Sequence, residues 1–218
     1  MTDESLFREV DEEIRQEQYK KLWARYGNLI IAVCVVVVAG MAGYKGWQYW
    51  QVQQAHSAGE TFFEAAKLSG QGKFDDAIKQ FQSVEHTGYG ALAKLREAGV
   101  LAAQGKADDA VKAYDAIAAN TSFDASLRDL AKMRAALVLA DTAAPADLEA
   151  RVKPFDVAGN DWRHTAREIM ALAFWRASDY AAADTAVKSI LADAETPIGT
   201  RQRAQVLAEL LVPVLAPK

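Results

Sequence analysis

The sequence contains few of the residues that break helices or cross-link chains. Only five prolines occur among 218 residues, and Ala, Leu, Lys, Glu and Gln are abundant, which favours an all-helical chain. A single cysteine, Cys34, excludes an intramolecular disulfide and a cysteine-based metal cluster. Because Cys34 lies in an apolar run, we expect it to be a small buried thiol.

Motifs of catalysis and cofactor binding are also missing. His56, His86 and His164 are far apart in the sequence, without the paired spacing of a metalloprotease, and each is expected to be a surface or capping residue. No glycine-rich phosphate loop and no Gly-x-Ser-x-Gly sequence is found. A net charge of −4 gives no electrostatic support for binding nucleic acid. We therefore predict neither an enzyme nor a cofactor, a metal, a nucleic-acid partner or a small-molecule substrate.

One segment is apolar enough to cross a membrane. No residue from Tyr26 to Tyr44 is charged, and a helix of this length spans roughly 28 Å, close to the thickness of a hydrocarbon core. Aromatic residues flank both ends, as membrane–water interfaces favour: Trp23, Tyr26, Tyr44, Trp47, Tyr49 and Trp50. We predict a transmembrane helix over residues 26–46 and a juxtamembrane helical connector over 47–56. A cleaved signal peptide is the alternative, but the preceding segment is long and rich in acids.

The basic residues near this segment predict its orientation. Lys20, Lys21 and Arg25 precede the span and only Lys45 follows it closely, so the N-terminus is expected in the cytoplasm. In a bacterial inner membrane, the domain after the span would then lie in the periplasm. Residues 1–25 have the spacing of a cytoplasmic amphipathic helix. Its apolar face is either solvated, or on the membrane surface, or a docking face for a membrane partner, with Leu6, Phe7, Val10 and Ile14 as the candidate contacts.

A short motif recurs in the rest of the chain. QGKFDDAIKQF, residues 71–81, returns as QGKADDAVKAY, residues 104–114, and four units align from about Ala58, Ala91, Asp129 and His164. Each unit has alanine at one position and a second small or aliphatic residue after the turn: Ala65, Ala98, Ala136 and Ala171, then Ala77, Ala110, Leu148 and Ala183. Helix–turn–helix units with a period of about 34 residues resemble tetratricopeptide repeats, which stack into solenoids.

The predicted fold is therefore all-α. An N-terminal amphipathic helix and one transmembrane helix precede a tetratricopeptide-repeat-like α-solenoid over residues 57–218, which ends in a C-terminal capping helix. The third unit is the least regular, because TAAPADL replaces the Gly-Lys turn. Pro145 is expected to start its second helix, and the stretch around Pro154 to interrupt it. The stretch around Pro154 is either a loop that contacts a partner or a decayed repeat. We also expect Pro213 to end the capping helix.

The first helix of each unit is expected to line the inner face of the solenoid, and in this sequence that face is mostly apolar. Its side chains either pack against neighbouring helices or form a groove for a partner helix or an extended segment. The candidate groove residues are Phe62, Leu92, Leu95, Leu130, Met133, Leu137, Leu172 and Trp175.

The arrangement as a whole resembles a known family. The segment REVDEEIRQEQYKKLWARYG, the apolar span and the QGKFDDAI repeat are similar to the ancillary SecYEG translocon subunit family (YfgM-like). That resemblance implies an inner-membrane protein with a periplasmic repeat domain, which acts beside translocon subunits, periplasmic chaperones and exported chains. The residues alone predict a membrane-anchored protein-binding scaffold. A scaffold or assembly factor for another envelope complex, such as division or respiratory machinery, is the alternative.

Overall fold

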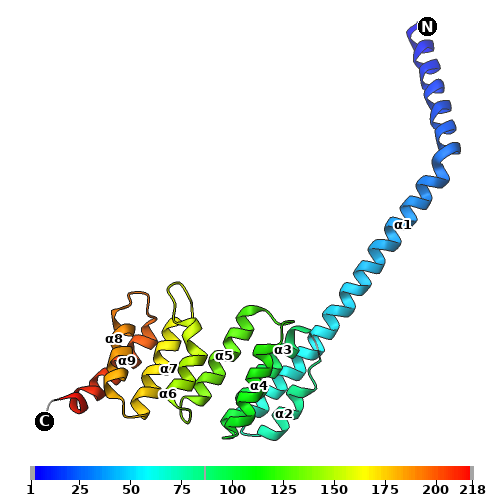
Figure 1. Ribbon diagram of the computed structural model, residues 1–218. Coiled ribbons are helices and arrows are strands. Elements are labelled where there is room, and N and C mark those ends of the chain that lie inside the picture. Colours follow the sequence, from blue (N-terminus) through cyan, green and yellow to red (C-terminus); the bar gives the residue numbers. More distant parts are fainter. Residues whose placement is uncertain (1–2, 86, 217–218) are drawn as a thin grey trace. The chain divides into compact units, whose positions relative to one another are not determined.

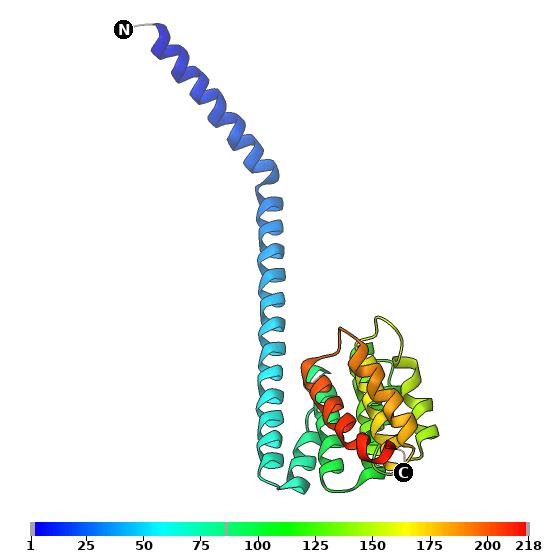
Figure 2. The same cartoon turned by 90° about the vertical axis from the view of Figure 1, so that its left-hand side faces the viewer.

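The computed structural model describes residues 3–85 and 87–216, with side chains for residues 19–85 and 88–216. Within these ranges the only regular secondary structure is helical, so the predicted all-α fold class is confirmed. The chain divides into two compact units between His56 and Ser57. Figure 1 labels the helices, and Figure 2 gives a second view of them.

Helix α1, Asp3–Gly70, provides the described part of the first unit and the first helix of the second. From Tyr19 onward it contains an 18-residue stretch with a mean hydropathy of 2.1, and 6% of that stretch is buried. The helix is therefore long and apolar enough to cross a membrane. Cys34 is exposed, which corrects the expectation of a buried thiol. The reason is that no other helix belongs to the described part of this unit, so nothing covers the side chain.

The second unit is built from helix pairs that follow one another along the chain (Figure 1). The end of α1 pairs with α2, Phe74–Gln82, through a core that contains Ala65, Ala77 and Phe81. The next pair consists of α3, Thr87–Ala103, and α4, Ala107–Ala119. Two further pairs and a last helix complete the unit: α5, Ala125–Leu139, with α6, Pro145–Val152; α7, Arg163–Arg176, with α8, Tyr180–Ala192; and α9, Ile198–Leu215.

The recurring Gly-Lys motif forms the turn within the first two pairs. Gly72 has φ +76° and Gly105 has φ +75°, the left-handed conformation that glycine adopts without a steric penalty. At the first turn, the amide of Lys73 donates to the carbonyl of Leu68 and that of Gly72 donates to Ser69, at 3.0 and 3.1 Å. These two bonds are the Schellman arrangement that ends a helix and satisfies its last carbonyls. The motif recurs because it reverses the chain at the same place in the first two repeats.

The small residues predicted at the helix crossings are buried in all four repeats. The alanines of the first helices are at most 1% exposed, and so are the matching residues of the second helices: Ala65, Ala98, Ala136 and Ala171, then Ala77, Ala110, Leu148 and Ala183. Side chains without bulk let two helices approach closely, and larger apolar residues at helical spacing fill the remaining space. The predicted repeat register is therefore confirmed at these positions in all four repeats.

The third repeat departs from this pattern after its turn. Helix α6 begins at Pro145 as expected and ends at Val152, which makes it eight residues long. A 3₁₀ turn, Lys153–Phe155, follows, and Pro154 lies within it. Phe155 then packs into the core formed by α5, α6 and α7. The predicted interruption at Pro154 is confirmed, and the residues after it still supply one core side chain.

Helix α9 packs on α8 through Ala204, Leu207 and Leu211, as a capping helix does. It continues through Pro213 to Leu215, so the expectation that Pro213 ends it was wrong. A proline at this position removes one hydrogen bond, to the carbonyl four residues earlier. That carbonyl belongs to Glu209, an exposed residue, and water can bind it there.

Charged side chains connect α7 to the segment between α8 and α9. The carboxylate of Asp193 accepts hydrogen bonds from Arg163 at 3.1 Å and from Arg167 at 3.2 Å, and Arg163 also pairs with Glu195. Arg201 of α9 donates to the carbonyls of Leu191 and Asp193, both at 2.7 Å, at the end of α8. We call Arg163, Arg167, Asp193 and Glu195 the cap network, because together they join the fourth repeat to the turn before the last helix.

The turn of the fourth repeat offers a stabilising substitution. Ser178 occupies the place of Gly72 and Gly105 and has φ +61°, with the same bond from Asp179 N–H to the Phe174 carbonyl at 2.9 Å. A side chain in the left-handed region costs about 1 kcal/mol. We expect Ser178→Gly to raise the free energy of unfolding by about 0.5–1 kcal/mol, part of the gain being offset by the greater freedom of glycine in the unfolded chain.

The measurement is urea unfolding of the full chain in detergent micelles, followed by circular dichroism. The matched control is the reverse change, Gly105→Ser, at a site where an added Cβ meets no atom within 4 Å. It should destabilise by about 0.5–1 kcal/mol, because the added strain is partly offset by the lower freedom of serine in the unfolded chain. Equal stability of the Ser178→Gly variant and the wild type would show that Ser178 bears no strain.

Candidate protein-binding groove

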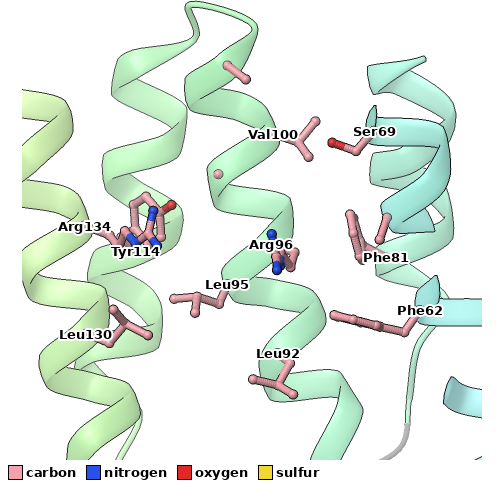
Figure 3. A pocket seen from close by; sticks show the side chains of 13 residues that line it. Phe62, Ser69, Phe81, Leu92, Leu95, Arg96, Val100, Tyr114, Leu130 and Arg134 are labelled. Atoms are coloured by element: carbon pink, nitrogen blue, oxygen red, sulfur yellow. The ribbon is translucent and has the colours of Figure 1, made fainter. Parts of the chain in front are cut away.

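The first helices of the first three repeats line a groove of about 630 Å³. Phe62 comes from the end of α1, Leu92 and Leu95 from α3, and Leu130 from α5, and all four were predicted as groove residues from the sequence. Figure 3 shows Phe62 on one side and Leu130 on the other, with Leu92 and Leu95 between them. Half of the predicted set is thus brought together in one place.

The other predicted groove residues do not line this cavity. Met133 is 1% exposed and packs in the core of α5, α6 and α7, so its inclusion was wrong. The physical reason is that it turns toward Leu148 and Ile169 in the interior, away from the solvent that a groove residue must face. Leu137 on α5 and Leu172 on α7 are about two-fifths exposed, at 41% and 42%. Trp175 is partly buried against Tyr180, with ring centroids 5.2 Å apart.

Two arginines and a tyrosine of the groove were missed by sequence reasoning. Arg96 of α3 and Arg134 of α5 line the cavity, and so does Tyr114 of α4 (Figure 3). The signal was present, because each arginine follows a groove leucine by four residues, Leu92 before Arg96 and Leu130 before Arg134. Residues four apart share a helix face. The two arginines were not predicted as groove residues, because the sequence criterion for that face was apolar character alone.

The two guanidinium groups act on the same phenol. Burial raises the pKa of the Tyr114 hydroxyl, and the positive charges of Arg134 and Arg96 oppose that rise. The side chain is 3% exposed, and a Cβ added at Gly99 would lie 3.3 Å from its hydroxyl oxygen. Glycine at position 99 therefore lets the phenol pack closely against α3, where a side chain would crowd its hydroxyl.

The candidate cytoplasmic docking face falls outside the described side chains. Leu6, Phe7, Val10 and Ile14 lie on the first turns of α1, where the structure describes the backbone alone. That interpretation stays a prediction.

Among the side chains that the structure describes, residues 19–85 and 88–216, no three histidines, cysteines or acids are grouped so as to hold a metal ion. His164, which we expected on the surface or at a cap, is buried beside Thr196, whose hydroxyl oxygen lies 3.1 Å from Nδ1. Burial, together with the charge of Arg163, lowers the pKa of His164 below its ordinary value. His164 thus packs as a neutral core residue between α7 and the segment that follows α8.

Comparison with protein families decides the classification of this solenoid. The model of the tetratricopeptide repeat-like domain matches residues 20–195, from the apolar part of α1 to the end of the fourth helix pair. The chain belongs to the tetratricopeptide repeat-like domain family. Searches of curated proteins and of solved structures return no match. Tetratricopeptide repeat-like domains are typically protein-binding scaffolds, so the expected class of partner is a protein.

Proposed function

We propose that this tetratricopeptide repeat-like protein is a single-pass membrane protein whose second unit binds other proteins outside the cytoplasm. The apolar part of α1 supports the anchor, since its side chains are exposed and a hydrocarbon environment would cover them. Trp23 and Tyr26 at one end, and Tyr44 and Trp47 at the other, are also exposed, as side chains at the two interfaces would be. Basic residues before the span favour a cytoplasmic N-terminus and a periplasmic second unit in a bacterial inner membrane.

The groove is the observation that carries the binding function. It is open to solvent and lined by aromatic and aliphatic side chains from three successive inner helices. Apolar grooves of this kind take an amphipathic helix or an extended segment of a partner, which buries its own apolar side chains there. A chain that still exposes apolar residues before it folds is such a partner.

We further propose that the scaffold works at the Sec translocon, on exported chains or on the periplasmic chaperones that receive them. The resemblance of the N-terminal segment, the span and the repeat motif to the ancillary translocon subunit family supports this partner. Anchoring confines the groove to the membrane surface, where exported chains emerge. Tethering raises the effective concentration of the groove for those chains without tight intrinsic affinity.

Photo-crosslinking in living Gram-negative cells tests this proposal. A photoreactive amino acid replaces Leu92, which is 45% exposed in the groove, and Lys112 on α4 provides an exposed control site outside it. We expect translocon subunits or exported chains among the adducts from position 92 and not from position 112. A third probe at Phe7 reports whether the N-terminal helix docks on the same subunits.

Two outcomes would contradict parts of the proposal. Adducts to a division or respiratory complex, with no translocon component, would support the alternative assembly-scaffold function. The same adducts from positions 92 and 112 would show that the groove is not the binding surface.

A further inference from the structure

The groove carries a local positive charge in a protein of net negative charge. Arg96 and Arg134 are among its lining residues and no aspartate or glutamate is, although the chain as a whole has a net charge of −4. Such a concentration of one sign in a concave surface raises the local concentration of groups of the opposite sign. A partner for this groove is therefore selected by charge as well as by apolar area.

The described part of the protein does not neutralise these two arginines. Neither forms an ion pair or a hydrogen bond within residues 19–85 and 88–216, and both are exposed. Their acidic neighbours in sequence are engaged elsewhere: Glu97 accepts from Gln82 at 2.6 Å, and Asp129 accepts from Lys132 at 2.9 Å. By contrast, six other arginines of this unit bind carboxylates or carbonyls: Arg151, Arg163, Arg167, Arg176, Arg201 and Arg203.

Apolar side chains lie on both sides of the Arg96 guanidinium. In Figure 3, Phe62 and Phe81 are on one side of Arg96, and Leu95 and Leu130 are on the other, toward Arg134 and Tyr114. A chain terminus held by Arg96 would leave the apolar surface on one of these sides uncovered. An acidic residue inside a segment covers both, because apolar residues continue before and after it.

We infer that the groove binds an apolar polypeptide segment that carries an internal aspartate or glutamate, whose carboxylate is held by Arg96 and Arg134. This inference rests on the proposed function and adds the chemistry of the partner to it. Guanidinium groups form charge-assisted hydrogen bonds with carboxylates in a planar, paired geometry. The Tyr114 hydroxyl can donate a further bond, since it makes no hydrogen bond within the described residues and remains protonated at neutral pH.

Fluorescence anisotropy with synthetic peptides tests the inference on the full chain in lipid nanodiscs. The first probe is an apolar peptide of leucine, valine and alanine with one central glutamate and both ends blocked. The second has glutamine in its place, and the third has glutamine and a free C-terminal carboxylate. Binding to empty nanodiscs is subtracted from each measurement.

We expect the glutamate peptide to bind about tenfold more tightly than the glutamine peptide, as two charge-assisted contacts would give. The difference should disappear in the double variant R96Q/R134Q. It should persist in K73Q/K106Q, which loses the same charge from two exposed turn positions outside the groove. High salt should reduce the difference, because both guanidinium groups are exposed to solvent.

The remaining outcomes separate the two levels of the proposal. Equal binding of the glutamate and glutamine peptides would overturn the carboxylate inference and leave the apolar groove intact. Preference for the free C-terminus over the internal glutamate would also overturn it. Absence of binding by all three peptides would contradict the groove function itself, and the inference with it.

Discussion

Leu148→Ala is expected to lower the free energy of unfolding by about 3 kcal/mol, within the range of about 2–5 kcal/mol for buried leucines. Leu148 is 0% exposed and packs with Met133, Val152 and Ile169 in the core of α5, α6 and α7. Removing its three outer carbons loses their burial and leaves a cavity that close-packed neighbours fill only in part. Urea unfolding of the full chain in detergent micelles, followed by circular dichroism, measures the change.

The comparison with the other repeats makes this result informative. Ala77, Ala110 and Ala183 occupy the same place in their repeats, and all are fully buried. If α6 can move in to the packing that alanine supports elsewhere, the cavity closes and only the lost burial of three carbons remains, a loss of about 2 kcal/mol. That outcome would contradict our expectation that α6 is fixed by its neighbours. Leu210→Ala on α9 is the control, since this side chain is 51% exposed and its loss leaves no cavity.

Asp193→Asn is expected to weaken the cap network most strongly at neutral pH. The Arg163 hydrogen bond, followed by the one from the Glu195 backbone amide, lowers the pKa of Asp193 from 3.8 to about 2. A carboxyl whose pKa is lower in the folded protein stabilises it above the unfolded value, and this contribution is lost as the pH falls toward the folded value. The variant should therefore melt at a lower temperature than the wild type above about pH 4.

The pH dependence distinguishes this mechanism from simple loss of packing. The difference in melting temperature between wild type and Asp193→Asn should shrink as the pH falls from about 4 toward 2, because the wild-type carboxylate itself becomes protonated. A constant difference at all pH values would contradict the electrostatic explanation. The control is Asp109→Asn, since Asp109 is 62% exposed and its nearest cation, Lys112, is 4.0 Å away.

His164 adds a second pH window to the same junction. Its pKa is lowered in the folded protein, so the unfolded chain binds the proton more readily. Stability from this residue is complete above about pH 6.5 and declines as the pH falls below that value. The acid sensitivity of the cap thus begins with the histidine and continues with Asp193 at lower pH.

The repeat register could be predicted from the sequence because it depends on spacing within each helix pair. Ala98 and Ala136 stand seven residues before the turn position in their repeats, and helical geometry alone places them at the crossing. The fold class follows from the same spacing. The direction of Met133 could not be predicted, because it depends on how α5 packs against α6 and α7, which the spacing within one helix does not give.

Contacts between residues far apart in the sequence could not be predicted either. Asp193 joins Arg163 and Arg167 through a turn whose path has no signature in the sequence. The polar part of the groove was accessible in principle, because Arg96 and Arg134 repeat the spacing of Leu92 and Leu130. These two arginines were not predicted, because a groove for apolar segments was expected to be lined by apolar residues alone.

The short helix α6 has a consequence for the order in which the second unit assembles during synthesis. In a stack where each repeat contacts its neighbours alone, folding starts wherever local structure is most favourable and spreads outward. The first two repeats have turns with glycine in the left-handed conformation, and they precede α6 in the chain, so they emerge before it. They can therefore fold first, whereas α6, about two turns long, becomes stable only when α7 packs against it. We therefore expect the unit to grow from its N-terminal repeats, with the irregular repeat completed by the one that follows.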